Sequence, residues 1–378
     1  MRAPLWLRLA VRVVPLLVAS AGMAYAAHDA GPPAQVLTQG RPAGAVALAV
    51  LGDSDSHAYQ DTLSFPPGSG ARGGAEHART FNWPEILARL RGRQLDLGPW
   101  LEWGTSGVSA SVDMVLGLDA GRVPRKVDYL YNFANSGAGC NDLTQGRFRQ
   151  APRLAHLMGK EPARWRQGIV VLRIGLNDWQ HMLELQSREP EAAPVQAAIE
   201  RCLRRHIEAI ALLRQQQPGL RFLIVGIGNE IDDPGQFEDY RSAAETRNIR
   251  EALDRYNGAM RALAERTPGA AFFDQDAWFQ RLWGARGPDG EPDAYRTVTL
   301  GSGAWRVTNS AGDTPDNALL GDHHAGVAWN ALWAQALVQR LKEAFGLPLA
   351  PVSDAELWRF LQPLVAPAAG PGVRARGS

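Results

Sequence analysis

Short apolar segments alternate with helix-forming stretches along most of this chain, and this alternation restricts the fold more than any other feature. Five segments have the length and composition of strands: residues 45–51, 129–133, 169–174, 221–227 and 271–273. Residues 83–91, 194–216 and a stretch starting near 327 are predicted to be helices. Strands that alternate with helices form parallel sheets. The sequence therefore predicts an α/β fold, with a central parallel sheet of about five strands and helices on both faces.

Three of these predicted strands are followed directly by a loop of small and polar residues. Ser54 ends a Gly-Asp-Ser turn after the first, Gly137 lies in Ala-Asn-Ser-Gly-Ala-Gly after the second, and Asn177 lies in Gly-Leu-Asn-Asp after the third. Gly-Asp-Ser alone is also common turn chemistry that merely closes a strand. Three such loops together are more informative, because open α/β sheets bind their ligands at the carboxyl ends of the strands.

A carboxylate and two imidazoles follow near the other end of the chain, in the sequence Asp322-His323-His324. A serine hydroxyl is a weak nucleophile at neutral pH until an imidazole accepts its proton, and that imidazole needs an acid to fix its tautomer. A strand that ends on Ser54, with a late acid and base, has the layout of an acyl-transfer enzyme.

These four blocks resemble the SGNH family, also called GDSL hydrolases, across residues 45–345. The resemblance implies a three-layer, flavodoxin-like fold. It also implies that Ser54 is the nucleophile, that Ser54, Gly137 and Asn177 form the oxyanion hole, and that His324 is the base. Asp53, Asp55 and Asp178 are expected to form turns and caps rather than to catalyse, and His57 is expected on the following helix or loop.

The last block departs from the family pattern, which is usually Asp-x-x-His. Gly321 stands three residues before His324, and the acid is Asp322, two residues before it. Residues i and i+2 of an extended segment point the same way, so Asp322 is still expected to reach the imidazole. His323 is the rival base. We prefer His324 because of its spacing from the helix that starts near residue 327.

The resemblance implies an esterase, and the leading substrate is an O-acetyl ester of a glycan or polysaccharide. Five tryptophans in or beside two predicted insertions offer indole faces that stack on sugars; they are Trp100, Trp103, Trp278, Trp283 and Trp305. A lipid or short-chain ester hydrolase, an O-acyltransferase and a catalytically silent glycan-binding module are the alternatives. No cofactor or metal is expected.

The first 26 residues have the form of a secretory signal peptide, with three arginines before an apolar run and Ala-Tyr-Ala at its end. An uncleaved membrane anchor is the alternative, although the run is short for a span. Residues 27–365 are predicted to be one hydrolase domain with insertions at about 60–127 and 284–320, followed by a disordered tail, 366–378. A periplasmic or secreted protein without stable membrane insertion is expected.

Charge and cysteine content fit this location. The chain has 40 basic and 39 acidic residues, and loss of three arginines with the signal leaves 37 against 39, a net charge of −2. Such a chain lacks the net positive charge that attracts the phosphates of a nucleic acid, so nucleic-acid binding is not expected. Cys140 and Cys202 are the only cysteines. In an oxidising compartment they either pair or leave a buried free thiol at Cys202.

Overall fold

The computed structural model describes residue 32 and residues 42–105, 121–287, 289–291 and 295–366. The predicted signal peptide and all of the predicted tail except Ala366 lie outside these residues. The main sheet has five parallel strands in the order β2-β1-β5-β6-β7. They are β1 (Val46–Gly52), β2 (Leu95–Asp96), β5 (Ile169–Arg173), β6 (Arg221–Val225) and β7 (Ala270–Phe273).

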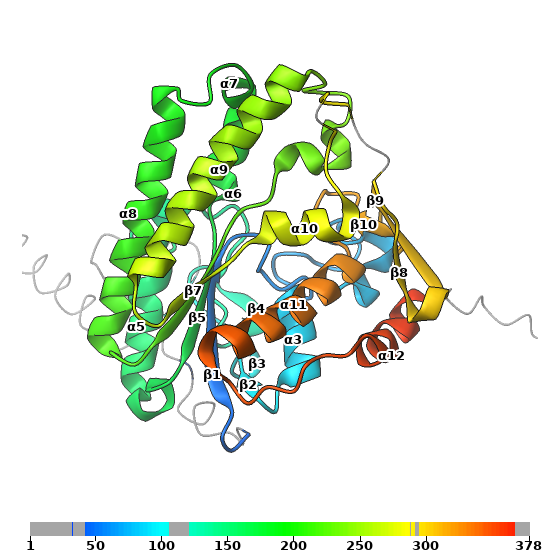
Figure 1. Ribbon diagram of the computed structural model, residues 1–378. Helices are drawn as coiled ribbons and strands as arrows, with labels where there is room; N and C mark the ends of the chain where they lie inside the picture. The colour runs from blue at the N-terminus through cyan, green and yellow to red at the C-terminus, as the bar shows by residue number, and fades with distance from the viewer. Residues whose placement is uncertain (1–31, 33–41, 106–120, 288, 292–294, 367–378) are drawn as a thin grey trace, which may run out of the picture.

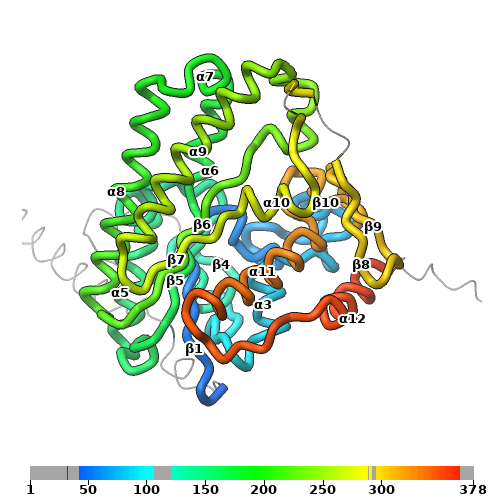
Figure 2. Tube along the Cα trace, viewed as in Figure 1, coloured from blue at the N-terminus to red at the C-terminus, as the bar shows by residue number. Residues whose placement is uncertain are grey.

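Helices cover both faces of this sheet, so the predicted three-layer α/β fold is confirmed (Figure 1). The helices are α3 (Trp83–Arg91), α5 (Gln150–Lys160), α6 (Leu176–Trp179), α7 (Leu183–Arg188), α8 (Ala193–Gln216), α9 (Ala243–Arg266), α10 (Gln275–Trp283), α11 (Val327–Phe345) and α12 (Asp354–Val365). Figure 2 shows α5, α8 and α9 on one side of the sheet and α3, α11 and α12 on the other.

The two-residue period of a strand explains the two separate cores. Ala47 and Ala49 of β1 face the core shared with α5, α8 and α9, whereas Leu48 and Val50 face the core shared with α3 and α11. Successive side chains of a strand point to opposite faces, and both faces of a parallel sheet are covered, so β1 is apolar throughout instead of alternating.

The strand prediction for residues 129–133 is wrong. Residues 126–129 form β4 (Lys126–Tyr129), which pairs antiparallel with β3 (Trp100–Trp103) outside the main sheet. Residues 130–133 run beside β1 but make only one isolated bridge with it, Val50 to Asn132. The place beside β1 in the sheet belongs to β2, whose two residues lie within the predicted first insertion.

A second small sheet occupies the other predicted insertion and leads the chain to the last motif. Its order is β10-β9-β8, with β8 (Val298–Leu300), β9 (Trp305–Ala311) and β10 (Asn317–Leu319). After β10 comes the loop with Asp322 and His324, and α11 begins at Val327. Within the part of the chain that the structure describes, no helix has the length and apolar character needed to cross a membrane.

Candidate active site

Ser54 lies in a tight turn at the carboxyl end of β1. The carbonyl of Asp53 accepts hydrogen bonds from the backbone N–H groups of Ser56 (3.2 Å) and His57 (3.1 Å), and its carboxylate accepts from the N–H of Asp55 (3.0 Å). Asp53 is 2% exposed, which agrees with the turn-forming role predicted for it. The turn leaves Ser54 half-buried at the edge of the sheet where parallel strands collect their ligands.

The structure brings Asp322 and His324 together despite their short spacing. His324 Nδ1 lies 3.2 Å from Asp322 Oδ1 and 3.0 Å from the Asp322 carbonyl oxygen. Although burial opposes it, the hydrogen bond from His324 holds the pKa of Asp322 well below its usual range. A proton on Nδ1 that is donated to Asp322 leaves Nε2 free to accept a proton from a serine.

The rival imidazole points elsewhere. His323 Nδ1 lies 2.9 Å from Asp233 Oδ1, and the His323 side chain is 51% exposed. Its backbone has a φ of 62°, a left-handed conformation that turns its side chain away from that of His324. This geometry favours His324 over His323 as the partner of Asp322.

No hydrogen bond joins Ser54 Oγ to His324 among the described residues. Catalytic hydrogen bonds are often long without a substrate and tighten only in the Michaelis complex, so this gap does not exclude the pair. Both residues lie on loops at the carboxyl end of the sheet, after β1 and before α11.

The two predicted oxyanion donors lie on neighbouring loops. Gly137 has a φ of 79° and an exposed backbone, and its N–H has no partner among the described residues. Asn177, in α6, donates one amide hydrogen to the carbonyl of Ala138 at 2.9 Å. A carboxamide carries two N–H hydrogens, so Asn177 keeps one for an oxyanion while its other bond holds the two loops together.

Sequence reasoning missed the role of His57, which lies in the turn after β1 and is fully buried. Its Nδ1 accepts from the backbone N–H of Ser136 at 3.2 Å and lies 3.2 Å from the Ser136 hydroxyl, and its Nε2 lies 2.9 Å from Asp61 Oδ2. Burial, followed by the charge of Lys126, lowers the pKa of His57 to about 4. A neutral His57 therefore fixes the loop that presents Gly137.

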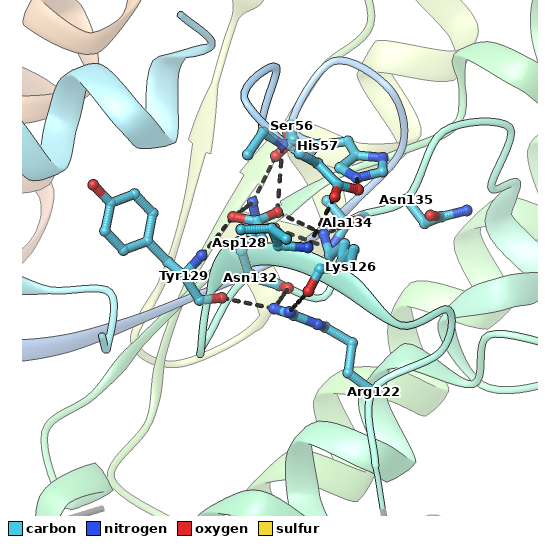
Figure 3. Close-up of polar contacts among 12 residues, drawn as sticks. Ser56, His57, Arg122, Lys126, Asp128, Tyr129, Asn132, Ala134 and Asn135 are labelled. Atoms are coloured by element: carbon cyan, nitrogen blue, oxygen red, sulfur yellow. Dashed lines mark hydrogen bonds and ion pairs between the residues drawn. The ribbon is translucent and has the colours of Figure 1, made fainter. Parts of the chain in front are cut away.

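A buried polar network supports this turn from the sheet side. Lys126 Nζ lies 2.7 Å from Asp128 Oδ2, and Asn132 Nδ2 donates to the carbonyl of Ser56 at 2.8 Å and to Asp128 Oδ1 at 3.2 Å. Figure 3 shows these side chains gathered around the backbone of Ser56 and His57. Buried polar groups that are mutually satisfied hold one arrangement, which gives the turn a rigid base.

Arg72, from the predicted first insertion, reaches the acid of the candidate triad. Its guanidinium donates to Asp322 Oδ2 at 2.5 Å and to the Ser136 hydroxyl at 3.4 Å. It also lies 2.8 Å from His324 Nδ1, which cannot accept this hydrogen bond in the tautomer that donates to Asp322. Arg72 is 5% exposed and lies over the ring of Phe65. No local motif marks this arginine, because its partners are about 250 residues away in the chain.

Cys140 and Cys202 form a disulfide with a Cα–Cα distance of 5.0 Å, which resolves the alternatives left open by the sequence. Cys140 begins the short helix that follows Gly137, and Cys202 lies in α8. Asp178 lies beside them and accepts from the N–H of Cys140 at 2.6 Å. The disulfide therefore anchors the Gly137 loop to a long helix.

The structure does not present the tryptophans as the sequence suggested. Trp103, Trp278 and Trp283 are 7%, 5% and 0% exposed and belong to the two cores, so they offer no face to a sugar. Trp100 is 39% exposed and contacts Tyr129 edge-on, and Trp305 is half-buried next to Trp358.

A family model described as GDSL-like Lipase/Acylhydrolase matches residues 48–337 of the sequence. The chain belongs to the GDSL-like lipase/acylhydrolase family. This GDSL chain is therefore an enzyme that hydrolyses ester bonds, and its four motifs fall within the matched range. No curated protein sequence matches it.

Solved structures similar to this GDSL chain include a catalytic mutant of an acetylxylan esterase from Geobacillus stearothermophilus, with 16% identity, 80% of this chain and 96% of that chain covered, and a TM-score of 0.35. A phospholipase A1 from Streptomyces albidoflavus has 16% identity, 66% and 92% coverage, and a TM-score of 0.35. An α/β hydrolase from the metagenome of Lake Arreo, Spain, has 18% identity, 82% and 100% coverage, and a TM-score of 0.38. Likeness at this level indicates no substrate.

Proposed function

We propose that this GDSL hydrolase is an exported serine esterase that removes small acyl groups, acetyl above all, from a glycan or polysaccharide. Ser54 is the nucleophile, His324 the base and Asp322 the acid that orients it. The observation that carries this proposal is the 3.2 Å contact between His324 Nδ1 and Asp322 Oδ1. The irregular spacing of the motif left it open whether Asp322 reaches the imidazole, and this contact supports that it does. The same contact favours an active enzyme over a catalytically silent module.

In the proposed reaction, Ser54 Oγ bonds to the ester carbonyl carbon while its proton passes to Nε2 of His324. The oxyanion that forms accepts hydrogen bonds from the N–H groups of Ser54 and Gly137 and from the amide of Asn177. The C–O bond to the alcohol then breaks, and His324 returns the proton to the leaving oxygen. Water, activated by His324, hydrolyses the acyl-serine.

One structural feature supports the proposed location. The Cys140–Cys202 disulfide suits an oxidising compartment, where such bonds persist. The glycan part of the proposal rests on export and on the exposed indole of Trp100.

Labelling with a fluorescent organophosphonate tests the nucleophile. The wild-type protein should be labelled and Ser54→Ala should not, while Ser54→Ala keeps the wild-type circular dichroism spectrum because the hydroxyl makes little contact with the core. Ser136→Ala is the matched control, since Ser136 carries the neighbouring hydroxyl that contacts an imidazole. Loss of label in Ser136→Ala with retention in Ser54→Ala would overturn the assignment.

Initial rates on aryl acetates, longer aryl esters and acetylated glycans then test the substrate class.

A further inference from the structure

A cavity with an acidic lining adjoins the turn that carries Ser54; Asp53 and Asp55 line it, whereas Ser54 and His324 do not. It is bordered by the two neighbours of Ser54 in the chain, by residues after β6, and by β9 and α11, and its volume is about 100 Å³. We call it the acidic pocket, after its five carboxylate residues: Asp53, Asp55, Glu230, Asp232 and Asp233. Trp329 and Phe279 contribute aromatic walls.

Only two of the five carboxylates have a cationic or imidazole partner in the pocket. Asp55 pairs with Arg173 at 3.1 Å, and Asp233 pairs with His323 at 2.9 Å. Within the described chain, Asp53, Glu230 and Asp232 form no ion pair. The pocket therefore holds three carboxyl groups for which the described residues supply no cationic partner.

Three buried oxygen atoms of the lining also have no hydrogen-bond donor. They are Asp232 Oδ2, Asn229 Oδ1 and Asn309 Oδ1, on residues that are 3%, 8% and 7% exposed. The orientation of Asn309 is fixed, because its Nδ2 donates to the carbonyl of Asp232 at 2.8 Å. Leaving a buried acceptor unpaired costs about 1–3 kcal/mol. Three unpaired acceptors in one cavity point to a ligand that carries donors.

The ionisation of the pocket is consistent with a missing positive charge. Burial, followed by the charge of Asp55, raises the pKa of Asp53 to about 8. Burial and nearby carboxylates raise the pKa of Glu230 to about 8, and burial raises that of Asp232 to about 7. These groups keep protons near neutral pH while the pocket is empty, and a bound cation would return them to carboxylates and release protons.

We propose that the acidic pocket binds a small ammonium group carried by the ester that Ser54 hydrolyses. An ammonium group supplies both the positive charge and, when it is not fully alkylated, the N–H donors that the unpaired oxygens require, and aromatic walls favour it further. The small volume admits a group of a few heavy atoms and excludes an extended polymer chain.

The position of the pocket specifies where the charge must be in the substrate. Asp53 and Asp55 flank Ser54 in the chain, and Leu176 of the lining precedes Asn177, so the pocket adjoins the candidate active site. This inference rests on the proposed function of Ser54. It narrows the substrate class to esters whose acyl or alcohol part carries an ammonium group close to the ester bond.

Binding to the Ser54→Ala protein tests the pocket without catalysis. 2-(Dimethylamino)ethyl acetate, whose ammonium carries one N–H, and its uncharged isostere 3-methylbutyl acetate are titrated in a calorimeter at pH 7 in two buffers that differ in ionisation enthalpy. The cationic ester should bind at least about tenfold more tightly, the difference expected for a buried charge contact, and its heat should depend on the buffer because protons are released. Equal affinity, or no binding of either ester, would overturn the proposal.

Single substitutions in the acidic pocket test which carboxyl groups cause the preference for the cationic ester. The kcat/KM ratio of the cationic to the neutral ester should fall about tenfold or more in Glu230→Gln, which removes a charge without breaking an ion pair. Asp232→Asn should act in the same direction and serves as the second variant if Glu230→Gln does not fold. Asp254→Asn is the control, an exposed carboxylate of α9 outside the pocket, and it should keep the wild-type ratio. A control that falls as far as Glu230→Gln would contradict the assignment.

Two further arms distinguish the source of the charge. Phenyl glycinate and phenyl propanoate compare an ammonium with a methyl group on the acyl side. 2-(Dimethylamino)ethyl acetate and 3-methylbutyl acetate make the same comparison on the alcohol side. A preference for the cation in either pair supports the proposal and identifies the side. Titration with Ca²⁺ and Mg²⁺ is the competing arm. One tight metal ion that is lost in Glu230→Gln, without ammonium binding, would overturn it. If Ser54→Ala hydrolysed esters at the wild-type rate, the proposed function would fail, while the binding result would stand.

Discussion

At the scale of single residues, the last motif shows how a shortened spacing preserves a contact. Asp322 and His324 are separated by one residue instead of two, and the left-handed backbone of His323 lets the two flanking side chains meet while its own side chain turns to Asp233. The acid reaches the imidazole from within a single turn of the loop. This departure from the family pattern is compatible with a working acid and base.

We predict that Asp322→Asn lowers kcat/KM by roughly a thousandfold or more near neutral pH, because the imidazole loses the acid that sets its tautomer. The measurement is kcat/KM against pH on an aryl acetate for the wild type and this variant.

The two histidines are separated by the same measurement. His324→Ala should be inactive, whereas His323→Ala should change the rate little, because its half-exposed ring contacts Asp233 and not Asp322. An inactive His323→Ala beside an active His324→Ala would mean that the base has been assigned one residue too late.

Asn177→Ala should lower kcat by about a hundred- to a thousandfold with a smaller change in KM, the usual loss for one oxyanion donor. Because Asn177 also donates to Ala138, the variant should be compared with Asn177→Asp, which is similar in size but has no N–H to donate. A change confined to KM would assign Asn177 to substrate binding instead.

At the scale of elements, the predictable parts were those encoded locally. The apolar period marked β1, β5, β6 and β7, and α3 and α8 follow helical patterns that begin with Asn82 as a cap and with Pro194 in the first turn. The two residues of β2 are too few to give a period, and residues 129–133 have strand composition without a strand partner along their length.

The residues of the candidate site also fall into those that a local motif marks and those that depend on distant contacts. Ser54, Gly137, Asn177 and His324 could be identified because each lies in a short motif at the end of an element. Arg72 and the bond between His57 and Ser136 could not, because they depend on contacts across about 79 to 250 residues. Nothing in the neighbouring sequence of an arginine predicts such a partner.

The disulfide is the strongest connection between two elements of the site. Replacing both cysteines, Cys140→Ser with Cys202→Ser, should lower the free energy of unfolding by about 4 kcal/mol, the loop-entropy value for a sequence separation of 62 residues. Denaturant unfolding with and without a reductant measures this. The reduced wild-type protein should match the double variant; if the oxidised wild type already does, the disulfide does not stabilise the fold.

At the scale of the whole molecule, buried carboxyl groups give an unusual dependence of stability on pH. Burial raises the folded pKa of Asp53 and Glu230 to about 8 and of Glu85 and Asp232 to about 7, against about 4 in the unfolded chain. The folded state then binds more protons than the unfolded state between about pH 4 and 8, so stability falls as pH rises through this range and levels off above it.

We therefore predict that the free energy of unfolding is at least about 1 kcal/mol larger at pH 6.5 than at pH 8. His57 acts in the opposite direction but outside this window. Its folded pKa of about 4 is lowered from 6.5, so its effect is a loss of stability as pH falls from 6.5 to 4. Urea unfolding between pH 6.5 and 8 tests the prediction, and Glu230→Gln should reduce the slope. A flat profile would mean that these carboxyls are ionised in the folded protein.

The order of strands in the main sheet leaves β1 without most of its pairing partners while the chain is being synthesised. β1 is the first strand to leave the ribosome, yet its longest partner, β5, lies more than a hundred residues further along the chain. Until then the most apolar strand has only the two residues of β2 and the isolated bridge to Asn132 beside it. A nascent chain in this state is prone to aggregate, because unpaired strand edges and apolar surface stay exposed. Chaperones that hold the chain extended until β5 has been synthesised would suit this topology better than folding as it emerges.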